Sequence, residues 1–301
     1  MSEGPEVKIV ADQISKALSN NTKIQNIIHN KLDNEMKNSI IGSYLKYVKT
    51  FGKNIVLKFS TNIYLRNHMM MWGKWRIYDK NDYDNGLAKP PPSYKSFFYK
   101  KDSIEDNNKS NKNPKNVKED KRTRLTIVTK EKVLVQFNGP ILQFSYKNPA
   151  KIEPIISLGP DGLDEKYDKE KVKHNIFHKS KNELLIANAL LDQKIVCGIG
   201  NKYKSEILFL NNVSPFKNVL SISDVQLNNI VIDIPRVLKW GYKNNGRTRD
   251  LNNDEKMSWN TTHWVFRRIG KPCWKCGSKI LSDRKKTPRI TFWCPTCQPL
   301  D

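Results

Sequence analysis

The sequence predicts an α+β protein with a β-rich first half, a helical second half and a metal-binding hairpin at its C-terminal end. Three observations indicate this. Short β-like runs recur between residues 24 and 146. After Asn148 the chain turns to apolar residues with helical spacing. Near its end stand two C-x2-C pairs, 17 residues apart, formed by Cys273, Cys276, Cys294 and Cys297.

The first half begins with a helix and continues with strands. We predict a helix over residues 5–18, because Pro5 suits the first helical position and apolar residues from Val7 to Leu18 recur on one face. Strands are predicted at residues 44–49, 54–59, 62–66, 75–78, 125–129, 132–137 and 141–146.

Residues 79–123 have a different composition, rich in Lys, Asn, Asp, Ser and Pro. Such a segment has too few apolar residues to form a core, so we expect a largely disordered surface insertion. The alternative is a functional basic arm, because lysine runs bind phosphate wherever they lie.

In the second half, helices are predicted at residues 184–191 and 202–210, on either side of Gly198-Ile199-Gly200-Asn201. A turn of this kind places backbone N–H groups at a helix N-terminus, which makes an anion site. The signal alone is weak, since many helix pairs turn on glycine without binding anything. Between the cysteine pairs, residues 287–293 are predicted to be one arm of a hairpin.

Charge narrows the class of partner. The chain has 301 residues, with 53 Lys plus Arg against 30 Asp plus Glu, a formal charge of +23 and a pI of about 9.7. This excess favours a polyanion, first nucleic acid and second an anionic membrane surface. No apolar run approaches the roughly 18 residues that a membrane span needs. The N-terminus lacks the apolar region of a signal peptide. We therefore expect an intracellular protein that is not secreted, in a reducing compartment such as nucleus or cytoplasm, including a viral replication site.

The spacing of the four paired cysteines predicts one structural zinc ion held by four thiolates. Redox dithiols or unrelated free cysteines are the alternative. The fifth cysteine, Cys197, lies in an apolar stretch and is expected to be a buried small hydrophobe.

The N-terminus offers a nucleophile. Ser2 is small, so removal of Met1 would leave a free α-amine beside Glu3. An α-amine has a pKa of about 7.7–8.0 and is partly neutral near pH 7. An amine with an adjacent carboxylate can form an imine at an aldehyde-level carbon. Alone this is weak, because every protein has an N-terminus.

Four stretches resemble the formamidopyrimidine-DNA glycosylase/endonuclease VIII family, in the family's order. They are Ser2–Glu6 at the start, Asn67–Arg76, Leu190–Tyr203 in the helix-two-turn-helix signature, and Gly270–Cys297 in the zinc finger. The similarity spans the chain apart from the insertion, and it is strongest to the endonuclease VIII branch. Heavy use of Lys, Asn and Ile would suit an AT-rich genome such as that of a large DNA virus.

The resemblance implies a fold and a function. The fold is a catalytic β-sandwich flanked by helices (1–148), a helix-two-turn-helix domain (149–270) and a zinc finger (271–301). The function is a monomeric, bifunctional DNA glycosylase/AP lyase of base excision repair that acts on damaged DNA, duplex or single-stranded. Oxidised pyrimidines and ring-opened purines are favoured over 8-oxoguanine. No membrane partner is implied.

The resemblance also implies roles for residues. The amine of Ser2 would attack C1′ of the damaged nucleotide, and Glu3 would protonate the sugar ring oxygen. Glu6 would order the site. Lys53 would contact phosphate and assist proton transfer.

Five further residues would bind DNA. Met70, Met71 and Trp72 would fill the space left by a flipped base. The alternative is that alternate residues of His68–Trp72 face the β core. Asn201 and Arg289 would hold the phosphates beside the flipped nucleotide.

One departure from the family concerns residue 2, which is usually proline. The primary amine of Ser2 gives an imine that must be protonated to withdraw electrons, so slower excision and slower β- and δ-elimination are expected. Two other functions stay open: a catalytically weak or inactive zinc protein that binds damaged DNA, and a zinc-ribbon RNA-binding or transcription accessory protein.

Overall fold

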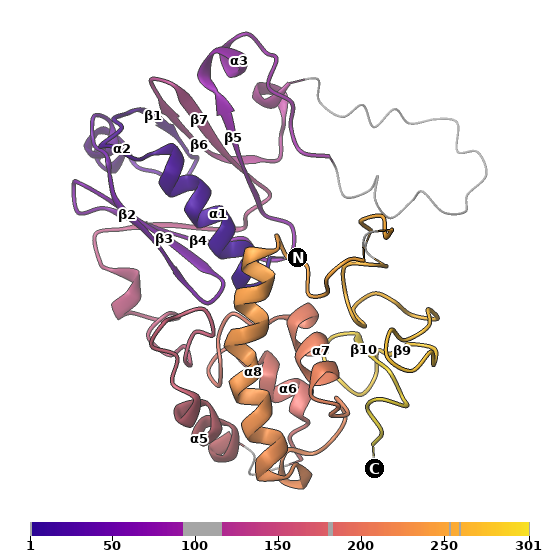
Figure 1. Cartoon of the computed structure of the whole chain (residues 1–301). Coiled ribbons are helices and arrows are strands. Elements are labelled where there is room, and N and C mark those ends of the chain that lie inside the picture. The colour runs from indigo at the N-terminus through magenta and orange to yellow at the C-terminus, as the bar shows by residue number, and fades with distance from the viewer. Residues whose placement is uncertain (1, 93–115, 180–182, 253, 259, 301) are drawn as a thin grey trace. The chain divides into compact units, whose positions relative to one another are not determined.

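The structure is a computed structural model that describes residues 2–92, 116–179, 183–252, 254–258 and 260–300 (Figure 1). These residues form two four-stranded sheets, a group of helices and a two-stranded hairpin. The α+β class predicted from the sequence is confirmed. None of the helices in the described part of the chain is long and apolar enough to cross a membrane.

The first sheet has the strand order β1-β6-β7-β5, and each neighbouring pair is antiparallel. Residues 133–137 of β7 are all completely buried, so both faces of this strand are covered. The strands of this sheet are β1 (Ile24–Ile28), β5 (Lys74–Asp79), β6 (Thr123–Thr129) and β7 (Lys132–Phe137).

The two ends of the predicted insertion belong to this part of the fold. Helix α3 (Lys80–Asp84) follows β5 directly, and a short 3-10 helix occupies Val117–Glu119. Ala88 and Val117 are buried against β7. The expectation of disorder is therefore wrong for residues 79–92 and 116–123, because apolar residues near each end anchor them to the sheet. The centre of the insertion, 93–115, lies outside the described residues.

The second sheet has the order β2-β3-β4-β8 and completes the sandwich. Strands β4 and β8 are antiparallel, with Tyr64 opposite Ser145. Its strands are β2 (Leu45–Phe51), β3 (Asn54–Phe59), β4 (Tyr64–His68) and β8 (Ile141–Ser145). Two further helices of the first half are α1 (Gly4–Ala17) and α2 (Asn34–Ile40).

The second half is built around one buried helix. Residues Asn201–Phe209 of α7 are all buried, and they pack among the other helices of one apolar core. In the described part of this half, the helices are α5 (Lys169–Lys179), α6 (Ile186–Leu191), α7 (Asn201–Leu210) and α8 (Asp224–Lys243), with 3-10 turns at Pro149–Lys151 and Val219–Ser221.

The hairpin at the C-terminal end consists of β9 (Leu281–Asp283) and β10 (Thr291–Trp293), which are antiparallel. Phe292 and Cys294 pack against Phe209, Val265 and Phe266 in a small core of their own. The hairpin is therefore joined to α7 by apolar packing.

The chain folds into two compact units that divide the sequence unevenly. Described residues of 12–48 and 57–146 form one, here called the β unit. Those of 1–11, 49–56 and 147–301 form the other, here called the helical unit. The N-terminal residues and the β2–β3 turn thus belong to the helical unit. The domain limits 1–148, 149–270 and 271–301, which the family resemblance implies, stay a prediction.

Candidate active site and zinc centre

The chain's N-terminal end lies against the glycine turn of the helical unit. The Gly4 N–H donates to the Gly198 carbonyl at 2.8 Å. A Cβ at Gly4 would lie only 3.1 Å from the Gly198 Cα, so the close approach favours glycine at residue 4, and the φ of +93° favours it at residue 198. Ser2, immediately before, is half-buried. This contact fixes residue 2 at the start of α7.

Glu3 caps α7 with its side chain. The carboxylate is 1% exposed and accepts the backbone N–H groups of Gly200, Lys202 and Tyr203 at 3.0, 2.8 and 3.2 Å. A Cβ at Gly200 would lie 2.4 Å from the Glu3 carboxyl carbon. The glycine turn is thus an anion site, as its sequence suggests, but the anion is the chain's own Glu3.

Glu6 receives three donors one turn further along α1. Its carboxylate accepts the Glu3 N–H at 3.2 Å, the Lys202 ammonium at 2.5 Å and the Tyr203 hydroxyl at 3.1 Å. No role was predicted for Lys202 or Tyr203 from the sequence. The signal that could have indicated Lys202 is its position in the first turn of α7, where the helix dipole disfavours a cation.

Lys53 lies in the turn between β2 and β3, which the helical unit includes. Burial lowers the pKa of its ammonium; the carboxylates of Glu3 and Glu6 oppose that shift, and Arg289 adds to it. Four of the predicted site residues are therefore within electrostatic range of one another.

Asn201 is hydrogen-bonded to the backbone of the hairpin residue that follows Arg289. The Asn201 side chain donates to the Ile290 carbonyl at 2.7 Å and accepts from the Lys204 ammonium at 2.9 Å. Asn201 is only 4% exposed, so it links α7 to the hairpin and offers little surface to a phosphate. Arg289 is exposed at the hairpin tip.

Met70, Met71 and Trp72 lie in the β unit, in the turn between β4 and β5. They are 48%, 36% and 41% exposed, whereas the preceding Met69 is buried. Met70 has φ +52°, which ends the alternation of the strand. The alternative that members of this run face the β core therefore fails for these three, and holds for Met69.

A pocket of about 400 Å³ opens beside Glu3, Glu6 and Lys202. Its remaining wall comes from the chain that follows α8, at Asn245–Arg247, Met257, Ser258, Thr262, His263, Phe266 and Arg267. Both parts belong to the helical unit. Its volume is in the range of small-molecule sites.

Glu206, a buried residue of α7, organises that wall. Its carboxylate accepts the N–H groups of Trp264, Val265 and Phe266 at 2.8–2.9 Å, and also the Thr248 hydroxyl. Helix α7 is thus hydrogen-bonded to both sides of the pocket: its first N–H groups bind Glu3, and Glu206 binds the backbone of residues 264–266.

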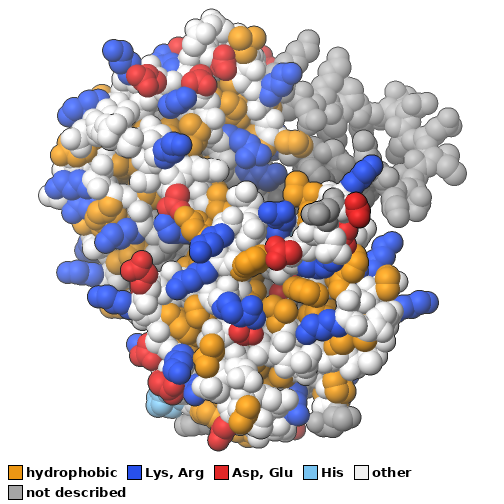
Figure 2. All heavy atoms as spheres, in the orientation of Figure 1, with side chains coloured by type: hydrophobic (Ala, Val, Ile, Leu, Met, Phe, Trp, Pro, Cys, Tyr) orange, Lys and Arg blue, Asp and Glu red, His pale blue; other side chains and the backbone are white. Residues whose placement is uncertain are grey.

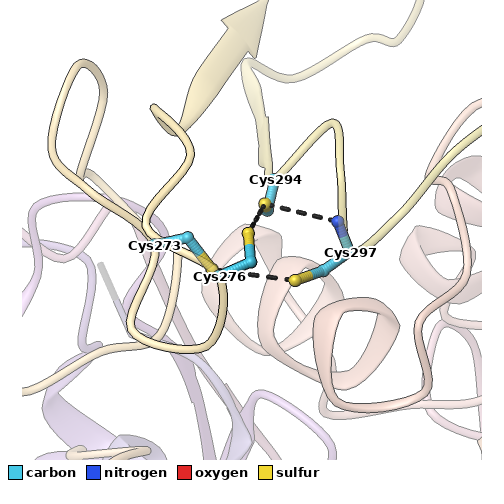
Figure 3. Close-up of side chains that lie close together, drawn as sticks. All are labelled: Cys273, Cys276, Cys294 and Cys297. Atoms are coloured by element: carbon cyan, nitrogen blue, oxygen red, sulfur yellow. Dashed lines mark hydrogen bonds between the residues drawn. The ribbon is translucent and has the colours of Figure 1, made fainter.

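The four paired cysteines converge on one point (Figure 3). Their sulfurs all lie within 4.8 Å of one another, with Cys273–Cys297 at 3.8 Å and Cys276–Cys294 at 3.4 Å. A zinc–sulfur bond of about 2.3 Å gives a tetrahedron with edges of about 3.8 Å, so the cluster fits zinc. Backbone N–H groups of Lys275 and Cys297 point at two of the sulfurs, as expected around thiolate ligands. The predicted structural zinc site is confirmed by this cluster.

Cys197, the fifth cysteine, is 2% exposed and lies outside the cluster. Burial raises the pKa of its thiol. It is a buried apolar residue, as predicted.

Comparison with known proteins gives a consistent result. Residues 1–140 match the model of the formamidopyrimidine-DNA glycosylase N-terminal domain, and residues 158–252 match the H2TH domain of the same glycosylase. The chain is 24% identical to Endonuclease 8 of Escherichia coli over 302 residues, which is 99% of this chain and 100% of that protein. It is 38% identical to formamidopyrimidine-DNA glycosylase of Prochlorococcus marinus over 151 residues, 49% of this chain and 50% of that one.

Solved structures share the fold. The chain is similar to Fpg of Lactococcus lactis in complex with DNA that contains an abasic site, with a TM-score of 0.72, 20% identity and 99% of both chains covered. It is also similar to MutM bound to DNA containing carbocyclic 8-oxo-G, with a TM-score of 0.73, 21% identity and the same coverage. The relatives named here whose source is given are bacterial, so they do not support a viral source.

Proposed function

We propose that this chain, which belongs to the formamidopyrimidine-DNA glycosylase family of base excision repair, is a bifunctional DNA glycosylase/AP lyase for oxidised bases. One observation carries the proposal. The residue that would bear the free amine is held at the glycine turn of α7, beside Glu3, Glu6 and a pocket. Lys53 interacts electrostatically with Glu3, Glu6 and Arg289.

The chemistry begins with the Ser2 amine, freed by removal of Met1. Its lone pair attacks C1′, and the glycosidic bond breaks as the damaged base leaves with a proton. Opening of the sugar ring forms the imine, and the ring oxygen takes a proton from Glu3. Loss of a C2′ proton then expels the 3′ phosphate, and a second elimination releases the 5′ phosphate.

Other residues would bind the substrate. Lys53 and Arg289 would hold phosphates, because both are cations and Lys53 lies within electrostatic range of Glu3 and Arg289. Met70, Met71 and Trp72 would fill the space left by the flipped base; their exposure in one short turn supports this. Asn201 would act mainly by holding the hairpin of Arg289, since its side chain is already bonded to Ile290.

The pocket beside Glu3 and Glu6 would receive the flipped base. Damaged DNA, duplex or single-stranded, is the proposed partner, since relatives of the same fold were crystallised with lesion-bearing DNA. Oxidised pyrimidines and ring-opened purines are the proposed lesions. Lys and Arg exceed Asp and Glu on the face in Figure 2, which suits a polyanion.

Zinc would be structural in this scheme. Four thiolates fill its tetrahedral coordination and leave no position for substrate or water. The ion would stiffen the hairpin that carries Arg289.

Borohydride trapping on an abasic-site oligonucleotide tests the proposal. The wild-type chain should form a covalent adduct, and mass spectrometry should locate it on the α-amine of Ser2. Glu3→Gln should reduce trapping, whereas Lys239→Met, an exposed charge loss on α8, should leave it unchanged.

Three other outcomes would contradict the scheme. No adduct together with tight lesion binding would indicate a non-catalytic damage binder. An adduct on a lysine would keep the lyase and reject the Ser2 mechanism. Binding indifferent to lesions would favour an accessory nucleic-acid-binding protein.

A further inference from the structure

Lys202 connects the two walls of the pocket through a single buried ammonium. Its Nζ donates to Glu6 Oε1 at 2.5 Å on one side and to the Gly246 carbonyl at 2.8 Å on the other. The ring centroid of Tyr203 lies 4.3 Å from the same nitrogen. Since an ammonium has three N–H donors, these contacts use its full capacity.

The position of this lysine calls for a specific role. A cation in the first turn of a helix is opposed by the helix dipole. Lys202 is also only 7% exposed, and burial of an unpaired charge is costly. Both penalties are offset only because Glu6, Gly246 and Tyr203 surround the ammonium.

Gly246 is shaped to meet this ammonium. Its φ is +87°, and a Cβ there would lie 2.7 Å from Glu6 Oε1 and 3.2 Å from Lys202 Nζ. The backbone therefore approaches the ion pair as closely as a residue without a side chain allows. The Gly246 N–H donates to the Gly241 carbonyl at 2.7 Å, so this turn is hydrogen-bonded to the last turn of α8.

We propose that Lys202 is a positioning residue that sets Glu6 and the turn Asn245–Arg247 relative to each other. The inference rests on the proposed function, because its consequence is the seating of a flipped nucleotide beside the Ser2 amine. With Lys202 in place, Glu6 stays hydrogen-bonded to the Glu3 N–H next to that amine. Without it, Glu6 loses its ion-pair partner and the pocket wall loses its anchor.

Two substitutions break the link from opposite sides. Lys202→Met keeps the length of the side chain and removes the ammonium. Gly246→Ala keeps the ammonium and displaces the backbone that it binds. Each should lower the single-turnover rate of base excision by about 10- to 100-fold, as small misplacements of reacting groups do. Lys202→Arg should recover most of the rate, and Lys239→Met is the control of equal charge loss.

A double-substitution cycle separates the ion pair from general damage. If Lys202 acts through Glu6, then Lys202→Met added to Glu6→Gln should cost much less than Lys202→Met alone. Purely additive losses, or no rescue by Lys202→Arg, would overturn the inference.

Amide hydrogen exchange gives a readout that needs no activity. Lys202→Met should speed exchange at Gly246 and Arg247 at least about tenfold, while amides within the core of α7 keep their protection. Unchanged exchange at the turn would overturn the inference even if the enzyme is active. Absence of trapping by the wild-type chain would reject the proposed function, and exchange would still decide the role of Lys202.

Discussion

At the scale of single residues, α7 buries a lysine side chain against the hairpin. Lys204 is fully buried between α7 and the hairpin, and its ammonium donates to Asn201 and, at 2.7 Å, to the Thr291 hydroxyl. Burial lowers its pKa from 10.5 to about 7. The contact between α7 and the hairpin therefore includes the Lys204 ammonium, which titrates near neutral pH.

This pKa predicts a pH dependence of stability. Between pH 7 and about 10 the unfolded chain binds a proton at Lys204 that the folded chain has released, so the free energy of unfolding should rise with pH. At about 1.4 kcal/mol per pKa unit the effect is a few kcal/mol at most. Lys204→Met should remove it, and should be the more stable form at pH 6.5 even after losing about 1 kcal/mol of hydrogen bonding.

Denaturant unfolding of wild type and Lys204→Met at pH 6.5 and 9 measures this. The difference between the two proteins isolates Lys204 from the other titrating lysines. Parallel pH profiles would mean that Lys204 keeps an ordinary pKa in the folded chain.

The nucleophile itself gives a second prediction at this scale. Ser2→Pro replaces a primary amine with a secondary one, whose imine is charged without an added proton. We expect excision and strand cleavage to become about tenfold faster, which requires only about 1.4 kcal/mol of barrier. Rates on an abasic-site and a lesion-bearing oligonucleotide should both rise. Equal rates would show that imine protonation is not limiting.

At the scale of elements, sequence reasoning succeeded where one local signal was sufficient. The limits of β3 and β7 are those predicted, because each is a short apolar run that is buried along almost its whole length. It missed α8, the 20-residue helix, although Ser223 and Gln226 form a capping box there. Pro235 lies inside α8 and argues against a continuous helix, although buried apolar residues recur at helical spacing on both sides of it.

In the candidate site, too, features with a local sequence signal could be predicted and contacts between distant residues could not. The cysteines could be predicted from spacing alone, because both C-x2-C turns are local. The capping of α7 by Glu3 could not, since the partners are almost 200 residues apart in sequence. For the same reason the bonds of Lys202 to Glu6 and Gly246 left no local pattern beyond a lysine in an unfavourable position.

The zinc hairpin gives a prediction about an element. Cys276→Ser should lose zinc, loosen the hairpin and weaken binding to an abasic-site duplex at least as much as Arg289→Ala does, because Arg289 depends on that hairpin. Cys197→Ser makes the same chemical change outside the cluster and should retain one zinc per chain. Metal analysis and fluorescence anisotropy test this. Full affinity in a zinc-free protein would separate the hairpin from DNA binding.

At the scale of the whole molecule, the excess of positive charge decides how the protein finds DNA. A net charge of +23 predicts strong binding to undamaged DNA at low salt, and binding that weakens steeply as salt rises. Arg289→Ala should reduce the slope of log affinity against log salt by about one, as loss of one phosphate contact does. Lys239→Met removes an equal charge on α8 and should change the slope less. If both variants change it equally, the charge acts as a diffuse field, and Arg289 makes no phosphate contact of its own.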